Sequence, residues 1–209
     1  TINIHRSIVM IKLLKNLTLV VLVAFFTVFS SVQAEEGQLR GGVEAGFSPV
    51  DLEAEETAQQ LANLSGSTVT VEYDTGAFVG RLFGNYGITS NMDVEVGYFQ
   101  TSDIDATYKI GSDSATESYS ANGIDFSLIA KGDTGFYGKA GVHSSTIDAF
   151  GSIKIGSTTY SVTEQYDGSS WLAGAGFEQD NVRYSFTHYN NIGGDGGADF
   201  NMFSVAYLF

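Results

Sequence analysis

The sequence predicts an all-β protein, namely an eight-stranded antiparallel up-and-down transmembrane β-barrel. Eight segments alternate apolar and polar residues with a period of two, the pattern of a strand with two different faces. The connections between these segments are alternately short and long, as in outer-membrane barrels. Glycine, at 25 of 209 residues, and aromatic residues, at 13%, are both abundant, whereas charged residues reach only 16%.

The composition excludes several other classes of protein. Because the chain contains no cysteine, it has no disulfide framework, no thiol nucleophile and no cysteine-ligated zinc site. The 24 acidic and 10 basic residues give a formal net charge of -14, whereas a nucleic-acid-binding protein needs a basic surface. The aromatic content is too high for a disordered acidic chain. We therefore expect a folded protein that binds no nucleic acid.

Met10 begins a segment with the organisation of a secretory signal peptide. Lys12 and Lys15 supply the positive front, residues 17–29 are apolar, and residues 32–34 carry the small residues of a cleavage site. The apolar run is shorter than the ~20 residues of a membrane-spanning helix, which disfavours a permanent anchor. We expect residues 1–34, the upstream residues plus the signal, to be removed. Since they hold three basic and no acidic residues, the charge of -14 becomes -17 for the domain 35–209.

The eight predicted strands have one apolar face each. In the third strand, for example, apolar residues at 92, 94, 96 and 98 alternate with Asp93, Glu95 and Gly97. Segments of roughly 8–10 residues match a tilted membrane strand. A soluble β-sandwich also alternates, but here the second face combines single charges with many glycines, as a narrow lumen requires. The predicted strands comprise residues 42–47, 77–86, 92–98, 123–130, 136–143, 171–178, 182–189 and 201–209.

The connections predict which end of the barrel faces which side of the membrane. Residues 88–91, 131–135 and 179–181 form short turns, whereas residues 48–76, 100–121, 144–170 and 190–199 form long loops. Short turns on the periplasmic rim and long loops outside are typical of outer-membrane barrels. Both ends of the domain then lie on the periplasmic side. Residues 153–155 and 160–162 in the third loop indicate that strands five and six extend beyond the membrane as a hairpin.

The first long loop predicts a short helix and an acidic cluster. Ser48 is expected as the N-cap, with Pro49 in the first turn and Asp51 completing a capping-box-like pattern, and Gly66 is expected to end the helix. Two interpretations of the acidic residues remain open: a solvated rim, or a site for divalent cations that bridge to lipopolysaccharide or for a receptor. The acidic cluster consists of Asp51, Glu53, Glu55 and Glu56.

Four stretches, together with the C-terminus, resemble the outer membrane protein A (OmpA)-like transmembrane domain. They are residues 76–80, 94–98, 174–178 and 183–193. The resemblance implies a cell outer membrane location in a Gram-negative-type bacterium, reached by export through the periplasm. It also implies that Tyr207 and Phe209 form the signal read by the barrel assembly machinery. The sequence departs from the family at Ser204, often a glycine, at Ser185, often an acid, and at Ile129, a lysine in some members.

Charged residues on the second face predict a network inside the lumen. In the family such a network plugs or gates the barrel, and Glu95, Glu178 and Arg183 match its positions. Independently, a charge inside a narrow barrel is costly unless it is paired. Two interpretations stay open, a static polar plug and a narrow gated ion pore. The predicted lumen network consists of Arg81, Asp93, Glu95, Asp125, Lys139, Glu178 and Arg183.

An enzymatic function has little support in the sequence. Some barrels of this size modify lipid A with a histidine, a serine and an acid, and here His143 and Ser145 share one strand face. A histidine at a strand end is more often an anchoring residue, and no metal-binding, phosphate-binding or nucleophile motif is present in the sequence. We therefore expect no cofactor and no catalysis. The predicted function is a structural or adhesion-like role, with lipopolysaccharide and a surface or host receptor as candidate partners.

Overall fold

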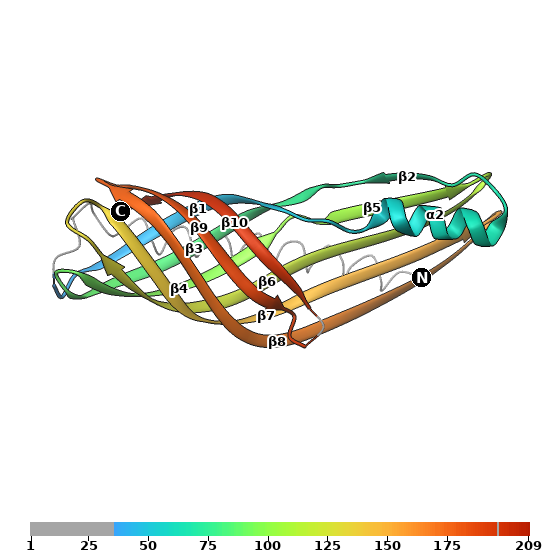
Figure 1. Ribbon diagram of the computed structural model, residues 1–209. Helices are drawn as coiled ribbons and strands as arrows, with labels where there is room; N and C mark the ends of the chain where they lie inside the picture. The colour runs from blue at the N-terminus through green and yellow to red at the C-terminus, as the bar shows by residue number, and fades with distance from the viewer. Residues whose placement is uncertain (1–35, 196) are drawn as a thin grey trace.

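The computed structural model describes residues 36–195 and 197–209, and there the chain folds into a barrel with a long projecting sheet (Figure 1). Within this part of the chain there are ten strands and one helix. Their bounds are β1 Leu39–Pro49, α2 Ala54–Ser65, β2 Thr70–Tyr73, β3 Gly76–Thr89, β4 Met92–Thr101, β5 Ile104–Ile110, β6 Asp113–Lys131, β7 Phe136–Ile155, β8 Thr158–Gln179, β9 Val182–Ile192 and β10 Ala198–Leu208.

Eight of the strands close into a ring. The order β1-β3-β4-β6-β7-β8-β9-β10 follows the chain, every neighbour is antiparallel, and β10 returns to pair with β1 from Gly42↔Leu208 to Phe47↔Phe203. Closure leaves no free backbone edge in the ring, which is what allows a barrel to lie in an apolar environment. The predicted fold class, an eight-stranded antiparallel up-and-down barrel, is confirmed.

The two ends of the barrel differ as the connections predict. Residues 90–91, 132–135 and 180–181 form short turns at one end, called the turn end below. The C-terminus lies at the same end (Figure 1). Asp180 adopts a left-handed conformation with φ of 54°, which suits a two-residue turn. The opposite end is called the loop end.

At the loop end, three barrel strands continue far past the ring. β6, β7 and β8 are 19, 20 and 22 residues long. β5 pairs with the first part of β6, and β2 pairs with β5, so a five-stranded sheet projects from the barrel (Figure 1). We call this sheet, residues 70–73, 104–122 and 144–170, the blade. The predicted hairpin around residues 153–162 is confirmed.

The prediction that residues 100–121 form a loop is wrong. They contain β5 and the first part of β6, joined by a tight turn at Gly111 with φ of 62°. Ile104, Ala106 and Tyr108 are buried in alternation with more exposed residues. A period of two was therefore present, but it belongs to the sheet that projects from the ring.

Helix α2 starts later than the sequence predicts. Ser48 and Pro49 are the last residues of β1 and pair with β3, so they do not cap the helix. The N-cap position is Glu53, whose side chain makes no capping hydrogen bond. Asp51 Oδ1 instead accepts a hydrogen bond of 2.9 Å from the Glu53 amide. Pairing of the β1 backbone with β3 outweighs the local helix-starting pattern.

The end of α2 and its packing agree with its sequence. Gly66 ends the helix with φ of 64°, and its amide donates to the carbonyl of Ala62 at 2.9 Å. Ala54 and Ala58 on the buried side of the helix pack on Ala106 and Tyr108 of β5. The helix therefore lies on one face of the blade (Figure 1).

The barrel strands turn their apolar side chains outward. Phe78, Phe136 and Ile124 are 72%, 64% and 59% exposed, whereas the charged residues of the alternate positions are buried. This is the reverse of a water-soluble barrel. No helix in the described residues is long and apolar enough to cross a membrane. The predicted signal peptide and start Met10 lie outside the described residues.

The close approach of the β6 and β7 backbones at Gly141 allows the register of these two strands to be tested by mutation. A Cβ atom at Gly141 would lie 2.0 Å from the carbonyl oxygen of Phe126, whereas nothing lies within 4 Å of one at Gly84. We predict that Gly141→Ala costs roughly 1–3 kcal/mol or more by overpacking and lowers the folded fraction, while Gly84→Ala does not. Heat-modifiable migration on cold detergent gels measures the folded fraction. Equal folding of both variants would contradict the assigned register.

Candidate functional site

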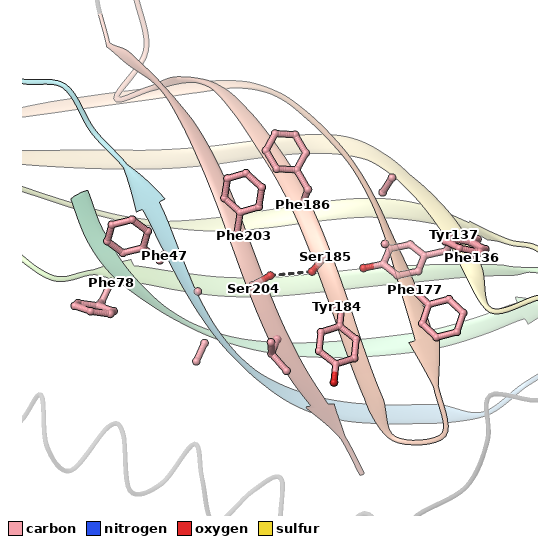
Figure 2. Close-up of a pocket in the computed structure, with 15 residues that line it drawn as sticks. Phe47, Phe78, Phe136, Tyr137, Phe177, Tyr184, Ser185, Phe186, Phe203 and Ser204 are labelled. Carbon is pink, nitrogen blue, oxygen red and sulfur yellow. Dashed lines mark hydrogen bonds between the residues drawn. The ribbon is translucent and has the colours of Figure 1, made fainter. Parts of the chain in front are cut away.

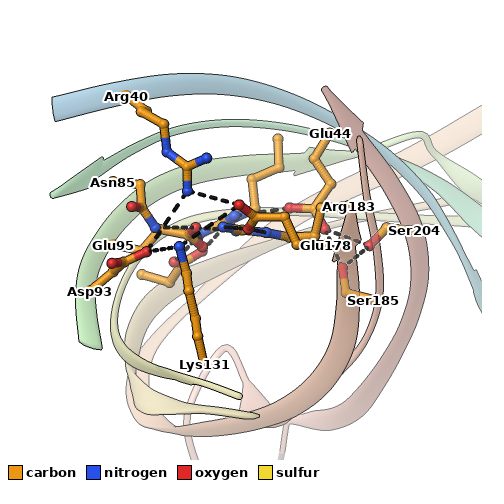
Figure 3. Close-up of polar contacts among 12 residues, drawn as sticks. Arg40, Glu44, Asn85, Asp93, Glu95, Lys131, Glu178, Arg183, Ser185 and Ser204 are labelled. Atoms are coloured by element: carbon orange, nitrogen blue, oxygen red, sulfur yellow. Dashed lines mark hydrogen bonds and ion pairs between the residues drawn. The ribbon is translucent and has the colours of Figure 1, made fainter. Parts of the chain in front are cut away.

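The barrel lumen contains equal numbers of acidic and basic side chains. All come from alternate, inward-facing positions of the ring strands, and eight of the ten residues are buried. The formal charge of this set is therefore zero, although the chain as a whole carries -14. Figure 3 shows part of the network viewed inside the barrel. Its members are Arg40, Glu44, Arg81, Asp93, Glu95, Asp125, Lys131, Lys139, Glu178 and Arg183.

Arg81 is the centre of the first cluster. Its Nη1 donates to Glu44 at 2.9 Å and its Nη2 to Glu95 at 2.8 Å. Nε and Nη2 together form a bidentate pair with Asp125, at 2.8 and 2.6 Å. Gly97 provides the space, because a Cβ there would lie 2.4 Å from the guanidinium. One fully buried cation thus holds three carboxylates from three other strands, with strong charge-assisted hydrogen bonds.

Arg183 forms the second cluster and shares Glu95 with the first. Its Nη1 donates to Glu95 at 2.5 Å, and its Nε and Nη2 donate to Glu178 at 3.0 and 2.8 Å. The ring of Phe83 lies against both guanidinium groups, with its centroid 5.0 Å from Arg81 Cζ and 5.2 Å from Arg183 Cζ. Such cation–π contacts add to the stabilisation of buried arginines. Glu95 therefore bridges the two arginines across the lumen.

A third group of charges lies nearer the turn end. Arg40 pairs with Glu178 at 2.9 Å and lies 3.9 Å from Asp93. Lys131 pairs with Asp93 and lies 3.8 Å from Glu178. These pairs are continuous with the Arg183 cluster through Glu178, so the network extends from the centre of the barrel to its turn end.

Two serines stabilise Glu44. Ser185 and Ser204 both donate to Glu44 Oε1, at 3.0 and 2.5 Å, and their hydroxyl groups lie 2.8 Å apart. Figure 3 shows the two hydroxyls on one side of the carboxylate. Two of the three positions at which this sequence departs from the OmpA-like pattern therefore bond to each other and to the same carboxylate. They give Glu44 partners in addition to Arg81.

An apolar cluster lies above the charges at the loop end. The ring of Tyr189 lies 5.1 Å from that of Phe99 and 6.2 Å from that of Phe200, and its hydroxyl donates to Asp125 at 3.3 Å. Tyr189 thus joins this cluster to the ion pairs below it. The loop-end apolar cluster consists of Ala77, Val79, Phe99, Ile104, Leu172, Tyr189, Ile192, Phe200 and Met202.

The seven residues predicted for the lumen network all lie in the lumen. Six of them form ion pairs, whereas Lys139, 6% exposed, has no ion pair with any described residue. Sequence reasoning missed Arg40, Glu44 and Lys131. The alternation of inward and outward positions along each strand could have identified these residues. Arg40 and Glu44 alternate with the apolar face of β1, and Lys131 continues the inward positions of β6. Lys131 was predicted to belong to a turn.

His143 and Ser145 lie on the same face of β7 as predicted, but they are buried, at 2% and 3% exposed. His143 Nε2 lies 2.8 Å from the carbonyl oxygen of Asn190, so this nitrogen carries the proton and donates. Nδ1 then accepts from Ser145 at 3.2 Å, and Ser145 in turn accepts from the Gly193 amide at 3.0 Å. The pair therefore ties β7 to the loop after β9.

The remaining predicted residues lie on the outside of the barrel. Tyr207 faces outward and is 52% exposed, and the Phe209 backbone exchanges two hydrogen bonds with Gly41 at the turn end. In the acidic cluster before and within α2, Glu55 accepts a hydrogen bond of 3.1 Å from Tyr73. Among the described residues, no group of three or more histidine or acidic side chains is placed to hold a metal ion. All four residues of the acidic cluster are exposed.

An apolar hollow of about 1020 Å³ lies on the outward side of the barrel wall across β10, β9 and β8 (Figure 2). Aromatic side chains surround it, including Phe47, Phe136, Phe186 and Phe203. The described residues that line it include no charged side chain. Small residues complete the lining, among them Ala45, Gly46, Ala175 and Gly176.

No protein-family model matches this chain, and no curated protein matches it. Solved structures with a similar arrangement include the attachment invasion locus protein Ail of Yersinia pestis, at 12% identity and a TM-score of 0.48, with 83% of this chain and 99% of that chain covered. The outer membrane protein OprG of Pseudomonas aeruginosa gives 9% identity and 0.47, covering 84% and 98%. The N-terminal β-barrel domain of OprF from the same species gives 13% and 0.41, covering 83% and 100%. These neighbours are small outer membrane β-barrels.

The network makes a direct prediction about Arg81. Arg81→Met leaves Glu44, Glu95 and Asp125 without their shared cation, and removing one partner from a buried pair costs about 3–5 kcal/mol. We expect urea unfolding of the purified barrel to report a loss of that size. Lys109→Met is the matched control, because the Lys109–Glu72 pair is exposed and is worth at most about 1 kcal/mol. Similar losses for both variants would contradict a structural role for Arg81.

Proposed function

We propose that this protein is an outer-membrane β-barrel that presents its blade at the cell surface and whose lumen is closed by paired charges. The observation that carries the proposal is the inverted distribution of side chains. Apolar and aromatic residues cover the outside of the ring, while ten charged residues lie inside it. Water favours the opposite arrangement, whereas a bilayer favours this one.

The backbone of the ring supports the same environment. Lipid supplies no hydrogen bonds, so a spanning structure must satisfy its amide and carbonyl groups internally. Each ring strand pairs on both sides, and β1 and β10 complete the closure. The apolar hollow on the outer wall is then a lipid-facing surface, which acyl chains fill.

Two groups of side chains close the lumen, the ion pairs and the loop-end apolar cluster. The ion pairs around Glu95 connect opposite walls of the barrel, and the loop-end apolar cluster covers them. Unpaired ions are costly in such an interior, so the paired arrangement is favoured over an open, charged channel. We propose that the lumen serves as a rigid plug that supports the blade.

The charge outside the lumen supports a role at the surface. Of the basic residues between 36 and 209, only Lys109 and Lys154 lie outside the network. Acidic residues dominate the loop end, including the cluster at Asp51, Glu53, Glu55 and Glu56. We propose an adhesion-like contact with a surface receptor, with divalent cations mediating contact with lipopolysaccharide. Assembly through recognition of Tyr207 and Phe209 is part of the same proposal.

A narrow gated ion pore is the second candidate, favoured by specific groups in the lumen. Lys139 has no ion pair with a described residue, and Ser127 Oγ and Thr187 Oγ1 have no hydrogen-bond partner in the described part of the chain. Buried polar groups of this kind bind water, and a hydrated path beside the ion pairs would let ions pass when the pairs rearrange. A lipid A-modifying enzyme has less support, because both ring nitrogens of His143 have structural partners.

Cysteine labelling tests surface presentation, and the chain contains no native cysteine to interfere. We predict that Ser161→Cys, on the blade, reacts with a membrane-impermeant maleimide on intact cells. Asp133→Cys, in the turn between β6 and β7, is the control and reacts only after the outer membrane is permeabilised. Labelling of both positions on intact cells, or of neither, would contradict the proposed orientation.

A further inference from the structure

One face of the blade is only partly covered. This face continues from the inward side of the barrel, and α2 packs on its β5 side through Tyr108 and Ala115. The β7 and β8 side is open, with Ile153 and Tyr160 52% and 63% exposed. We call it the tyrosine face. It consists of Ile104, Ala106, Tyr108, Ala115, Glu117, Tyr119, Ile147, Ala149, Gly151, Ile153, Tyr160, Val162, Glu164 and Tyr166, which share a face by register.

A hollow of about 280 Å³ lies in the tyrosine face. Gly151 of β7 forms its floor, and the walls on either side include Tyr108 of β5, Glu117 of β6, and Tyr160 and Val162 of β8. A Cβ at Gly151 would already lie 3.3 Å from Val162, so the absence of a side chain there keeps the hollow open. Its size suits one long side chain of a ligand and not a whole folded domain.

The polar groups of the tyrosine face are carboxylates hydrogen-bonded to tyrosine hydroxyls. Glu117 accepts hydrogen bonds from Tyr108 at 2.6 Å and from Tyr119 at 2.9 Å. Burial, followed by the bond to Glu117, raises the pKa of both tyrosines to about 12. Both tyrosines are therefore hydrogen-bond donors at neutral pH, and both donate to Glu117. Glu164 accepts a similar bond from Tyr166.

The two faces of the blade differ in charge. Lys109 and Lys154, which provide the positive charge of the blade, lie on the opposite face, where Lys109 pairs with Glu72 at 3.0 Å. The tyrosine face has Glu117 and Glu164 and no basic residue among its members. Carboxylates next to aromatic rings attract cations both by charge and by the negative face of the ring.

The edge next to this face is an unpaired strand. In the described residues, positions 158–167 of β8 pair with β7 alone, and the β8–β9 pairing starts at Leu172↔Tyr189. All ten side chains of this stretch are exposed. An exposed edge presents a row of free amide and carbonyl groups, to which an extended peptide can add as a further strand.

We propose that the tyrosine face and the adjoining β8 edge bind a basic, extended segment of a partner polypeptide. The segment pairs with β8 and directs alternate lysine or arginine side chains across the tyrosine face, next to Glu164 and toward the β8 wall of the hollow, with Glu117 adding negative charge farther across the same face. A second copy of this chain is a poor occupant, because its own β8 edge would bring Glu164 and Asp167 toward the same acidic surface. The inference deepens the proposed surface role and rests on it for its biological setting.

The probe is a ten-residue peptide of alternating lysine and valine, measured by fluorescence anisotropy against the purified, folded barrel in micelles. We expect saturable binding, at least about tenfold weaker in Glu117→Gln/Glu164→Gln. Glutamine can keep both contacts at position 117, because its Oε1 accepts from one tyrosine and its Nε2 donates to the hydroxyl of the other. The variant should therefore keep the fold, which heat-modifiable migration checks. The control Asp105→Asn/Asp148→Asn removes the same charge from the opposite face of the blade and should bind within about twofold of the wild type. The tenfold criterion corresponds to one decade in Kd.

Two further peptides make the result decisive. A peptide of alternating glutamate and valine should not bind, and the lysine peptide N-methylated at alternate residues should bind much more weakly because it cannot complete the strand pairing. Absence of lysine-peptide binding, equal losses in the two double variants, or undiminished binding of the N-methylated peptide would overturn the proposal. Because the measurement uses purified barrel, failure of the membrane orientation appears in the cysteine labelling and not here.

Discussion

The pairing of Glu95 with both Arg81 and Arg183 is the interaction on which the rest of the barrel depends. Through it and its immediate partners, six of the eight ring strands meet in the lumen: β1 by Glu44, β3 and β9 by the arginines, β4 by Glu95, β6 by Asp125 and β8 by Glu178. All of these charges except the half-buried Glu178 are buried, and a buried charge is costly without a partner. The network therefore constrains the register of the ring as well as the contents of its lumen.

The pairing of charges in the lumen also explains why the surface at the loop end is acidic. The network uses most of the basic residues of the domain to neutralise carboxylates, which leaves the loop end acidic almost without compensation. The same strands β6, β7 and β8 that contribute to the lumen continue into the blade. A rigid, neutral interior thus supports a charged outer sheet, and the two parts share one continuous set of hydrogen bonds.

The sequence predicted the ring well because a period of two specifies both strand and face. It placed Arg81, Glu95 and Arg183 in the lumen, but it did not predict which atoms meet, since register between distant strands is not a local property. Arg40 was missed because the first strand was predicted to start at residue 42. Glu44 lay inside that predicted strand, opposite its apolar face, and was still not assigned to the network. The helix was predicted to start too early, since pairing of Ser48 and Pro49 with β3 is a long-range contact that no capping pattern reveals.

Ion conductance across planar bilayers tests most directly whether the charged network closes the lumen. The account predicts that wild-type barrel, shown to be folded, passes no current above that of a protein-free bilayer. It also predicts that Arg183→Ala introduces a leak, because the change removes one cation partner from Glu95 and one from Glu178. Stable unitary currents in the wild type that are lost or resized in Glu95→Ala, but not in Asp105→Asn, would contradict it and establish a gated pore.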